Sequence, residues 1–183
     1  ITETVDTSKI TISTEEKTEY KDKYEEELFT RENPNDMYKV INVKVGNAKG
    51  YLVAIYEPEK VQLIRAKKFN AGTYGERVVD MCKRYGGSVS INAGRFANGL
   101  GNGSDRPKGY VIDDGKVVWK DGSSSKKGNI IGITNDGKLK LMSNTTGNEA
   151  INAGIKYGVE FGPFLIVNGK PSEVLGNGGW GTA

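Results

Sequence analysis

The chain has 183 residues, of which 36% are hydrophobic and 27% charged, and its formal net charge at pH 7 is +3. This composition is typical of a globular protein, and the length suits one ordinary domain with or without an appended segment. The basic residues do not gather with aromatic ones in a single stripe, so we expect no nucleic-acid partner. No apolar run reaches the length of a membrane span, so we expect no membrane contact by this segment.

The chain contains no histidine and a single cysteine, Cys82. These two facts exclude Ser/His/Asp and Cys/His nucleophilic sites, an intrachain disulfide and a zinc site built from such residues. Acid–base chemistry must therefore use Asp, Glu, Tyr, Lys or water. The cofactor stays open: a bound metal would be a hard, oxygen-ligated ion such as calcium, and no transition-metal site is expected.

The N-terminal residues 1–36 are rich in charge and poor in glycine. Ser13 and Glu16 fit a capping box. Three aromatic or apolar residues then recur every four positions on one helical face: Tyr20, Tyr24 and Leu28. The pattern predicts a short helix that ends before Pro34, within an N-terminal arm or linker over 1–36. We expect one domain over 37–183.

A change to period-two alternation follows the arm and predicts three strands, over 38–45, 51–58 and 61–66. Thr73 and Glu76 make a second capping box, and an apolar stripe after them predicts a helix that Gly86-Gly87 terminates. Cys82 lies on the apolar stripe of this helix. We expect it to be a small core residue rather than a nucleophile, since no histidine is present to activate it.

The second half of the chain is predicted to consist mainly of hairpins. A short strand is expected over 88–92. Three dipeptides then predict tight turns between strands: Asp114-Gly115, Asp136-Gly137 and Asn168-Gly169. Between the last two hairpins, Asn148 can cap a helix that carries Ile151 and Ile155 and ends near Gly158. These elements predict an α+β fold with a mainly antiparallel sheet and two or three helices.

The segment that follows the strand over 88–92 has the composition of a binding loop. Its run GLGNGS over 99–104 fits neither the dinucleotide-binding fingerprint nor the P-loop. Successive backbone N–H groups of such a run can still face an anion, with Arg95 or Arg106 as a fork for phosphate or carboxylate. Asn92 would stand at the end of the strand, and Phe96 could stack on the apolar face of a sugar ring.

Two carboxylates are the candidates for catalysis, Asp105 and Glu160. The other nearby acidic residues precede glycine or another turn residue and are expected to form turns: Asp113, Asp114 and Asp136. Asp105 serves no evident turn. Glu160 adjoins an apolar strand, where an unpaired charge is costly.

Three stretches in order resemble the motifs of the phosphodiester glycosidase family. They are a strand followed by Asn92-Ala-Gly94-Arg-Phe96, then Pro107-Lys-Gly109-Tyr-Val-Ile, then Phe161-Gly-Pro-Phe-Leu-Ile-Val-Asn-Gly169. The resemblance runs from about residue 38 to residue 183. The family has Asn-Gly-Gly-Phe-Phe in the first motif, so Ala93 and Arg95 depart from it. Arg95 in place of an aromatic residue changes the lining of the expected site and can add a contact to an anion.

The resemblance implies which residues would contact substrate. They are expected to be Asn92, Gly94, Arg95, Phe96, Arg106, Gly162, Pro163 and Asn168, with Asp105 and Glu160 as the catalytic carboxylates. The resemblance also implies that further motifs of the family follow the last of these. We therefore expect the domain over 37–183 to be incomplete at its C-terminus, and a second polypeptide is an expected source of the rest.

The function that the resemblance implies is hydrolysis of a sugar-1-phosphodiester similar to a GlcNAc-1-phosphodiester, in a cell-wall polymer or an exopolysaccharide. The expected partner is a sugar phosphate or phosphorylated glycan. The expected location is the outside or the surface of a bacterial cell. A non-catalytic cell-surface or phage-associated module that binds a phosphorylated glycan is the alternative, and a third reading is a partial fold without activity of its own.

Overall fold

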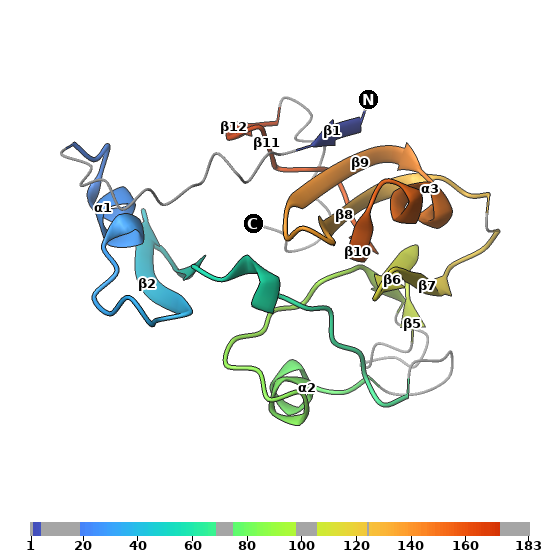
Figure 1. Ribbon diagram of the computed structural model, residues 1–183, viewed down its shortest axis with the longest axis horizontal. Helices are drawn as coiled ribbons and strands as arrows, with labels where there is room; N and C mark the ends of the chain where they lie inside the picture. Colours follow the sequence, from blue (N-terminus) through green and yellow to red (C-terminus); the bar gives the residue numbers. More distant parts are fainter. Residues whose placement is uncertain (1, 5–18, 69–74, 98–105, 124, 173–183) are drawn as a thin grey trace. The chain divides into compact units, whose positions relative to one another are not determined.

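The computed structural model describes residues 2–4, 19–68, 75–97, 106–123 and 125–172 (Figure 1). The chain divides into two compact units. We call Ser8–Val61 the hairpin unit, and Ile1–Thr7 together with Gln62–Ala183 the sheet unit. The expected boundary after residue 36 falls inside the hairpin unit. The two units are described separately.

The hairpin unit contains helix α1 (Lys23–Phe29), strands β2 (Tyr38–Val45) and β3 (Ala48–Ile55), and the short 3-10 helix η2 (Pro58–Lys60). The alternation predicted both strands, and they pair antiparallel with each other. Helix α1 is capped by Asp22, whose carboxylate accepts hydrogen bonds from the backbone N–H groups of Tyr24 and Glu25. The capping box predicted at Ser13 lies outside the described residues, and the helix ends at Phe29, before Pro34 as predicted.

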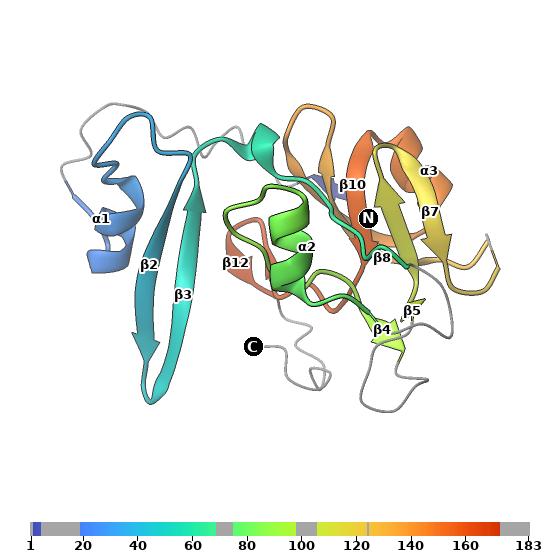
Figure 2. The same ribbon diagram turned by 90° about the horizontal axis from the view of Figure 1, so that it is seen from below.

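The sheet unit is built on a six-stranded antiparallel sheet with the strand order β1-β9-β8-β10-β6-β7. Its strands are β1 (Thr2–Thr4), β6 (Tyr110–Asp113), β7 (Lys116–Lys120), β8 (Gly128–Thr134), β9 (Leu139–Thr145) and β10 (Ile155–Glu160). Two short pairs add to it, β4 (Phe96–Ala97) with β5 (Arg106–Pro107) and β11 (Ile166–Val167) with β12 (Lys170–Pro171). With its helices, the chain has the predicted α+β fold (Figure 2).

Helix α3 (Gly147–Asn152) covers one face of this sheet and closes the core. The core residues come from α3 and four strands: Tyr110, Ile112, Ile130, Met142, Ala150 and Ile155. Ile112 and Ile130 are 0% exposed. Successive side chains of a strand point to opposite faces. Residues two positions from Ile112 or Ile130 therefore share the face that α3 covers.

Tight turns form at the predicted dipeptides. Asp114 and Gly115 join β6 to β7 with φ of 49° and 68°, and Asn168 and Gly169 join β11 to β12 with φ of 51° and 73°. Two consecutive positive φ angles are those of a type I′ hairpin turn. The third predicted turn joins β8 to β9, with Gly137 at φ 78°.

Two predicted strands are wrong. Residues 61–66 and 88–92 form no strand. A β-branched run becomes a strand only where another strand offers it hydrogen bonds, and neither segment has such a partner among the strands that the structure describes. The first is instead held by a side chain, because Arg65 Nε forms an ion pair with Asp113 Oδ2 at 2.7 Å. Asp113, which was expected to form a turn, is therefore the last residue of β6 and the partner of this ion pair.

Helix α3 is shorter than predicted and is capped by a different residue. Thr146, not Asn148, caps it, in a complete capping box with Glu149. The backbone and side-chain hydrogen bonds from Thr146 lower the pKa of the Glu149 carboxyl. The helix ends at Asn152 because Gly154 takes φ 91°. Ile155, predicted to be helical, begins β10 and is buried in the core.

Helix α2 (Val78–Arg84) ends as predicted, with Gly86 at φ 69° and the Gly87 N–H donating to the carbonyl of Cys82 at 2.8 Å. Cys82 is buried. Glu76 does not act as the predicted cap. Its carboxylate accepts two hydrogen bonds from the Arg84 guanidinium, at 2.7 and 3.1 Å, and this contact lowers the pKa of Glu76. The predicted cap residue Thr73 lies outside the described residues.

Candidate functional site

The candidate site lies at the edge of the six-stranded sheet where β10 ends and where β6 and β8 begin. Glu160 is the last residue of β10, Gly128 is the first residue of β8, and Gly109 directly precedes β6. Strand β10 pairs with both β6 and β8. Residues from three stretches that are well separated in sequence therefore meet around one carboxylate.

Both glycines leave room for the side chain of Glu160. A Cβ atom added at Gly109 or at Gly128 would lie 2.5 Å from Oε2 of Glu160, and the three atoms nearest to each added Cβ all belong to this glutamate. Real Cβ atoms do not approach other atoms so closely. Gly109 also has φ 78°, a conformation that disfavours any other residue. The carboxyl group thus occupies a cradle that exists only because two glycines line it.

The Oε2 atom of Glu160 is buried and has no hydrogen-bond partner among the described residues. A buried polar atom without a partner costs about 1–3 kcal/mol, and more when it is charged. Structures seldom carry this cost without a reason, and one frequent reason is a catalytic role. The arrangement can serve as a general base, as a nucleophile or as a negative charge beside a developing cation.

Gly162 of the third motif lies beside Asn129, on the face of the sheet opposite Glu160. Glu160 and its register partner Ile130 are on the α3 face, so Asn129, which precedes Ile130 in β8, points to the other face. A Cβ atom added at Gly162 would lie 2.9 Å from Nδ2 of Asn129, and the N–H of Phe161 donates to the carbonyl of Asn129 at 2.9 Å.

The first motif reaches this second face as well. A Cβ atom added at Gly94 would lie 3.3 Å from Cβ of Val159, the residue before Glu160. The structure therefore brings Gly94 and Gly162 to the end of β10. Both lie across the sheet from the carboxylate and not beside it.

The side chains expected to contact substrate in the first motif are exposed. Asn92 and Arg95 are exposed, and Phe96 is 59% exposed. Asn92 does not stand at the end of a strand, because the predicted strand before it is absent. The second motif holds this segment through its backbone: the N–H of Lys108 donates to the carbonyl of Arg95 at 2.8 Å, and Phe96 pairs with Pro107.

The remaining predicted residues are placed as follows. Arg106 is half-buried in β5, and Pro163 is half-buried after a cis peptide bond from Gly162. Asn168 occupies a hairpin turn, where its positive φ suits asparagine, so a substrate contact is not needed to explain it. Asp105, the other predicted catalytic residue, lies outside the described residues.

Among the residues of the site, Gly109 was identified only as part of the second motif, and Gly128 and Asn129 were not predicted. Asn129 Oδ1 accepts a hydrogen bond from the backbone N–H of Asn144 at 3.3 Å, which fixes the amide near Gly162. A sequence signal for it exists, because Asn129 is a polar residue in an otherwise apolar strand, GNIIGIT. Gly128 gave no such signal, since its importance depends entirely on the position of Glu160.

No group of three or more acidic or cysteine side chains in the described part of the chain is arranged to hold a metal ion. No helix in the described part of the chain is long and apolar enough to cross a membrane.

The family model for phosphodiester glycosidases matches residues 85–183, which is more than half of the chain. The chain belongs to the phosphodiester glycosidase family. The matched region contains all three motifs, both cradle glycines and Glu160, and it excludes the hairpin unit. The family name is that of a glycosidase-type hydrolase. Searches of the curated proteins and of the solved structures found no significant match.

Proposed function

We propose that this protein hydrolyses a sugar-1-phosphodiester at the bond between C1 of the sugar and the phosphate oxygen. The family supports the reaction class. The observation that carries the proposal is the buried Oε2 of Glu160, which has no partner among the described residues and is held between Gly109 and Gly128. A group kept in this way at the edge of a sheet, within the region that matches the family, is our candidate for the catalytic carboxylate.

The reaction makes modest demands on the protein. A water molecule forms the new C1–O bond, and the old bond breaks with its electron pair leaving on the phosphate. The leaving group is a phosphomonoester whose second pKa is about 6, so it departs as a dianion without needing a strong general acid. The proton of the attacking water goes to Glu160 in its carboxylate form, which also stabilises the positive charge that develops on the sugar. This chemistry is compatible with a chain that lacks histidine.

The finer features of the substrate are part of the same proposal. We assign GlcNAc as the sugar and a cell-wall or exopolysaccharide polymer as the source of the phosphodiester, outside or on the surface of a bacterial cell. Arg95 and Asn92 are suited by chemistry to the phosphate or the sugar hydroxyls, and the exposed ring of Phe96 is suited to the sugar face. Asp105 remains the proposed second carboxylate.

The test is hydrolysis of the methyl diester of GlcNAc-1-phosphate in water enriched in oxygen-18. We expect free GlcNAc with the label in the sugar, together with unlabelled methyl phosphate. Glu160→Gln, which keeps the shape of the side chain, should lower kcat/KM by about 10²–10⁴-fold. Asp80→Asn is the matched control, because it makes the same carboxyl-to-amide change at an ion pair with Arg77 on the surface of α2.

The outcomes separate the alternatives. Label in the phosphate would show a phosphodiesterase that cleaves the P–O bond. Full activity of Glu160→Gln would exclude Glu160 as the catalytic carboxylate. Tight binding of the diester without turnover by the unchanged protein would favour the non-catalytic glycan-binding module.

A further inference from the structure

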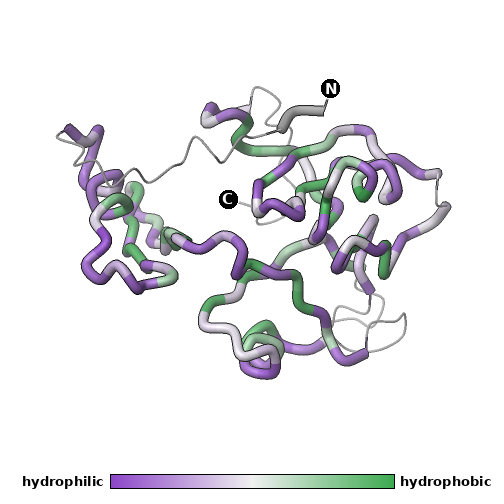
Figure 3. Tube along the Cα trace, in the orientation of Figure 1, coloured by the Kyte–Doolittle hydropathy of each residue, from purple (hydrophilic) through white to green (hydrophobic). Residues whose placement is uncertain are grey.

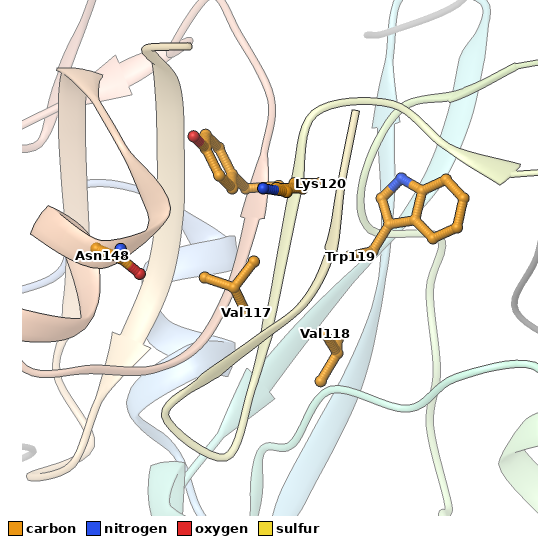
Figure 4. A pocket seen from close by; sticks show the side chains of 6 residues that line it. Val117, Val118, Trp119, Lys120 and Asn148 are labelled. Atoms are coloured by element: carbon orange, nitrogen blue, oxygen red, sulfur yellow. The ribbon is translucent and has the colours of Figure 1, made fainter. Parts of the chain in front are cut away.

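A cavity of about 420 Å³ lies in the sheet unit, at strand β7 and the start of α3. Six residues line it: Tyr110, Val117, Val118, Trp119, Lys120 and Asn148. Figure 4 shows Val117 directed toward Asn148, whereas the ring of Trp119 points away from both. Its volume is within the range of pockets that bind small ligands, about 300–1,000 Å³.

This cavity adjoins the cradle of Glu160. Gly158 pairs with Ile112, so the position two residues further along β10 places Glu160 beside Tyr110, on the same face of the sheet. Neighbouring strands lie about 5 Å apart. Tyr110 also follows Gly109 directly, and Gly109 lines the cradle. Tyr110 is therefore the wall that the cavity and the cradle share.

The shared wall is fixed in position. Tyr110 is 3% exposed, and its hydroxyl donates a hydrogen bond to the carbonyl of Lys126 at 2.7 Å. A Cβ atom added at Gly147 would lie 2.8 Å from its ring, so α3 packs directly against it. The hydroxyl bond also ties Lys126, which lies between β7 and β8, to a residue that lines the cavity, and Figure 3 shows the coloured parts of this connection as mainly hydrophilic.

The one charged side chain among the described residues that line the cavity is positive, that of Lys120. The connection that begins after Lys120 continues with two more exposed lysines, Lys126 and Lys127. Two acidic residues stand against them: Asp121 in the same segment, and Glu149 in α3, which forms an ion pair with Lys127 at 3.6 Å. The charge that lines the cavity itself favours an anionic ligand.

We infer that this cavity binds the aglycone of the phosphodiester and that it selects an aglycone with a negative charge of its own, such as a polyol phosphate or the next phosphate-bearing unit of a polymer. The inference rests on the proposed function, because it places the reacting sugar at Glu160. The Lys120 ammonium pairs with the second phosphate, and the Asn148 amide binds a hydroxyl of the polyol. The preferred substrate is then a chain with repeated phosphates rather than an isolated diester.

The test compares three diesters of GlcNAc-1-phosphate, in which the aglycone is methyl, glycerol or glycerol phosphate. We expect kcat/KM of the unchanged protein to be highest for glycerol phosphate, and this preference to weaken as salt is added. Lys120→Gln should reduce the preference for glycerol phosphate over glycerol by about tenfold, the size expected for one charged hydrogen bond. Asn148→Ala should reduce the preference for glycerol over methyl. Lys83→Gln, a change of an exposed lysine on α2, is the matched control.

Hydrolysis of the methyl diester tests the proposed function alone. A result can therefore contradict the inference about the aglycone without contradicting the proposed function. Turnover of the methyl diester without any preference for the charged aglycone would overturn the inference and leave the function intact. An unchanged preference in Lys120→Gln would do the same. If no diester is hydrolysed, calorimetric titration with glycerol phosphate decides: binding that Lys120→Gln weakens and Lys83→Gln does not supports the cavity, and equal or absent binding refutes it.

Discussion

Replacement of Gly128 by alanine tests the cradle of Glu160 directly. Gly128 is not among the glycines with positive φ, so alanine is compatible with its backbone. The added methyl group would lie 2.5 Å from Oε2 of Glu160, whereas ordinary contacts begin at 3.4 Å. The three atoms nearest to the added methyl group all belong to Glu160. The carboxyl group must therefore move by about 1 Å.

The magnitude follows from this displacement. Misplacement of a reacting group by about 1 Å costs roughly 10²-fold in rate, so we expect kcat/KM to fall by about that factor. Overpacking costs about 1–3 kcal/mol of stability. A harmless Gly→Ala change in a strand instead gains about 0.4–1 kcal/mol. In a Glu160→Ala background the obstacle is gone, and Gly128→Ala should then be neutral or stabilising.

The assay is a double-mutant cycle by urea unfolding of the unchanged protein, the two single variants and the double variant, together with kcat/KM for Gly128→Ala. We expect a coupling free energy of about 1–3 kcal/mol. Gly50→Ala in β3 is the control, because its added Cβ would make only an ordinary contact, 3.4 Å from Val43. Equal effects of Gly128→Ala in both backgrounds, or unchanged activity of the single variant, would refute the cradle.

Two further predictions concern stability. Thr146→Ala removes the capping box of α3 and should lower the free energy of unfolding by about 1 kcal/mol, measured with urea; no change would mean that packing on the sheet, not the cap, maintains the helix. Glu76 has a folded-state pKa below the ordinary value of 4.5, so its contribution to stability is present above that pH and is lost as the pH falls through the lower folded value. The melting temperature of Glu76→Gln should therefore decline less than that of the unchanged protein on acidification below pH 4.5, and parallel declines would contradict this role of the Arg84 contact.

Local chemistry explains the elements that were predicted correctly. The dipeptides Asp114-Gly115 and Asn168-Gly169 specify hairpin turns because few residues other than glycine, asparagine and aspartate accept positive φ. Gly86 ends α2 for the same reason. Such signals depend on the conformational preferences of one or two residues, so the sequence contains them in full.

The incorrect elements depended on partners that are distant in sequence. The run over 61–66 has the composition of a strand but pairs with none of the described strands. Ile155 continued a helical pattern, yet Gly154 ended the helix and the residue became the start of a buried strand. An apolar residue one turn further along a helix and an apolar residue at the start of a strand look alike in a sequence, and tertiary contacts decide between them.

The sequence by itself determined the class of fold, the family resemblance and the choice of Glu160 as a candidate, because a carboxylate beside an apolar strand is costly wherever that strand lies. Only the tertiary structure showed that Gly109 and Gly128 make room for this carboxylate and that Gly94 and Gly162 lie on the other face of the sheet. These relations join residues through strand pairing and not through spacing along the chain. Register and face are set by the packing of the whole sheet, which no local pattern contains.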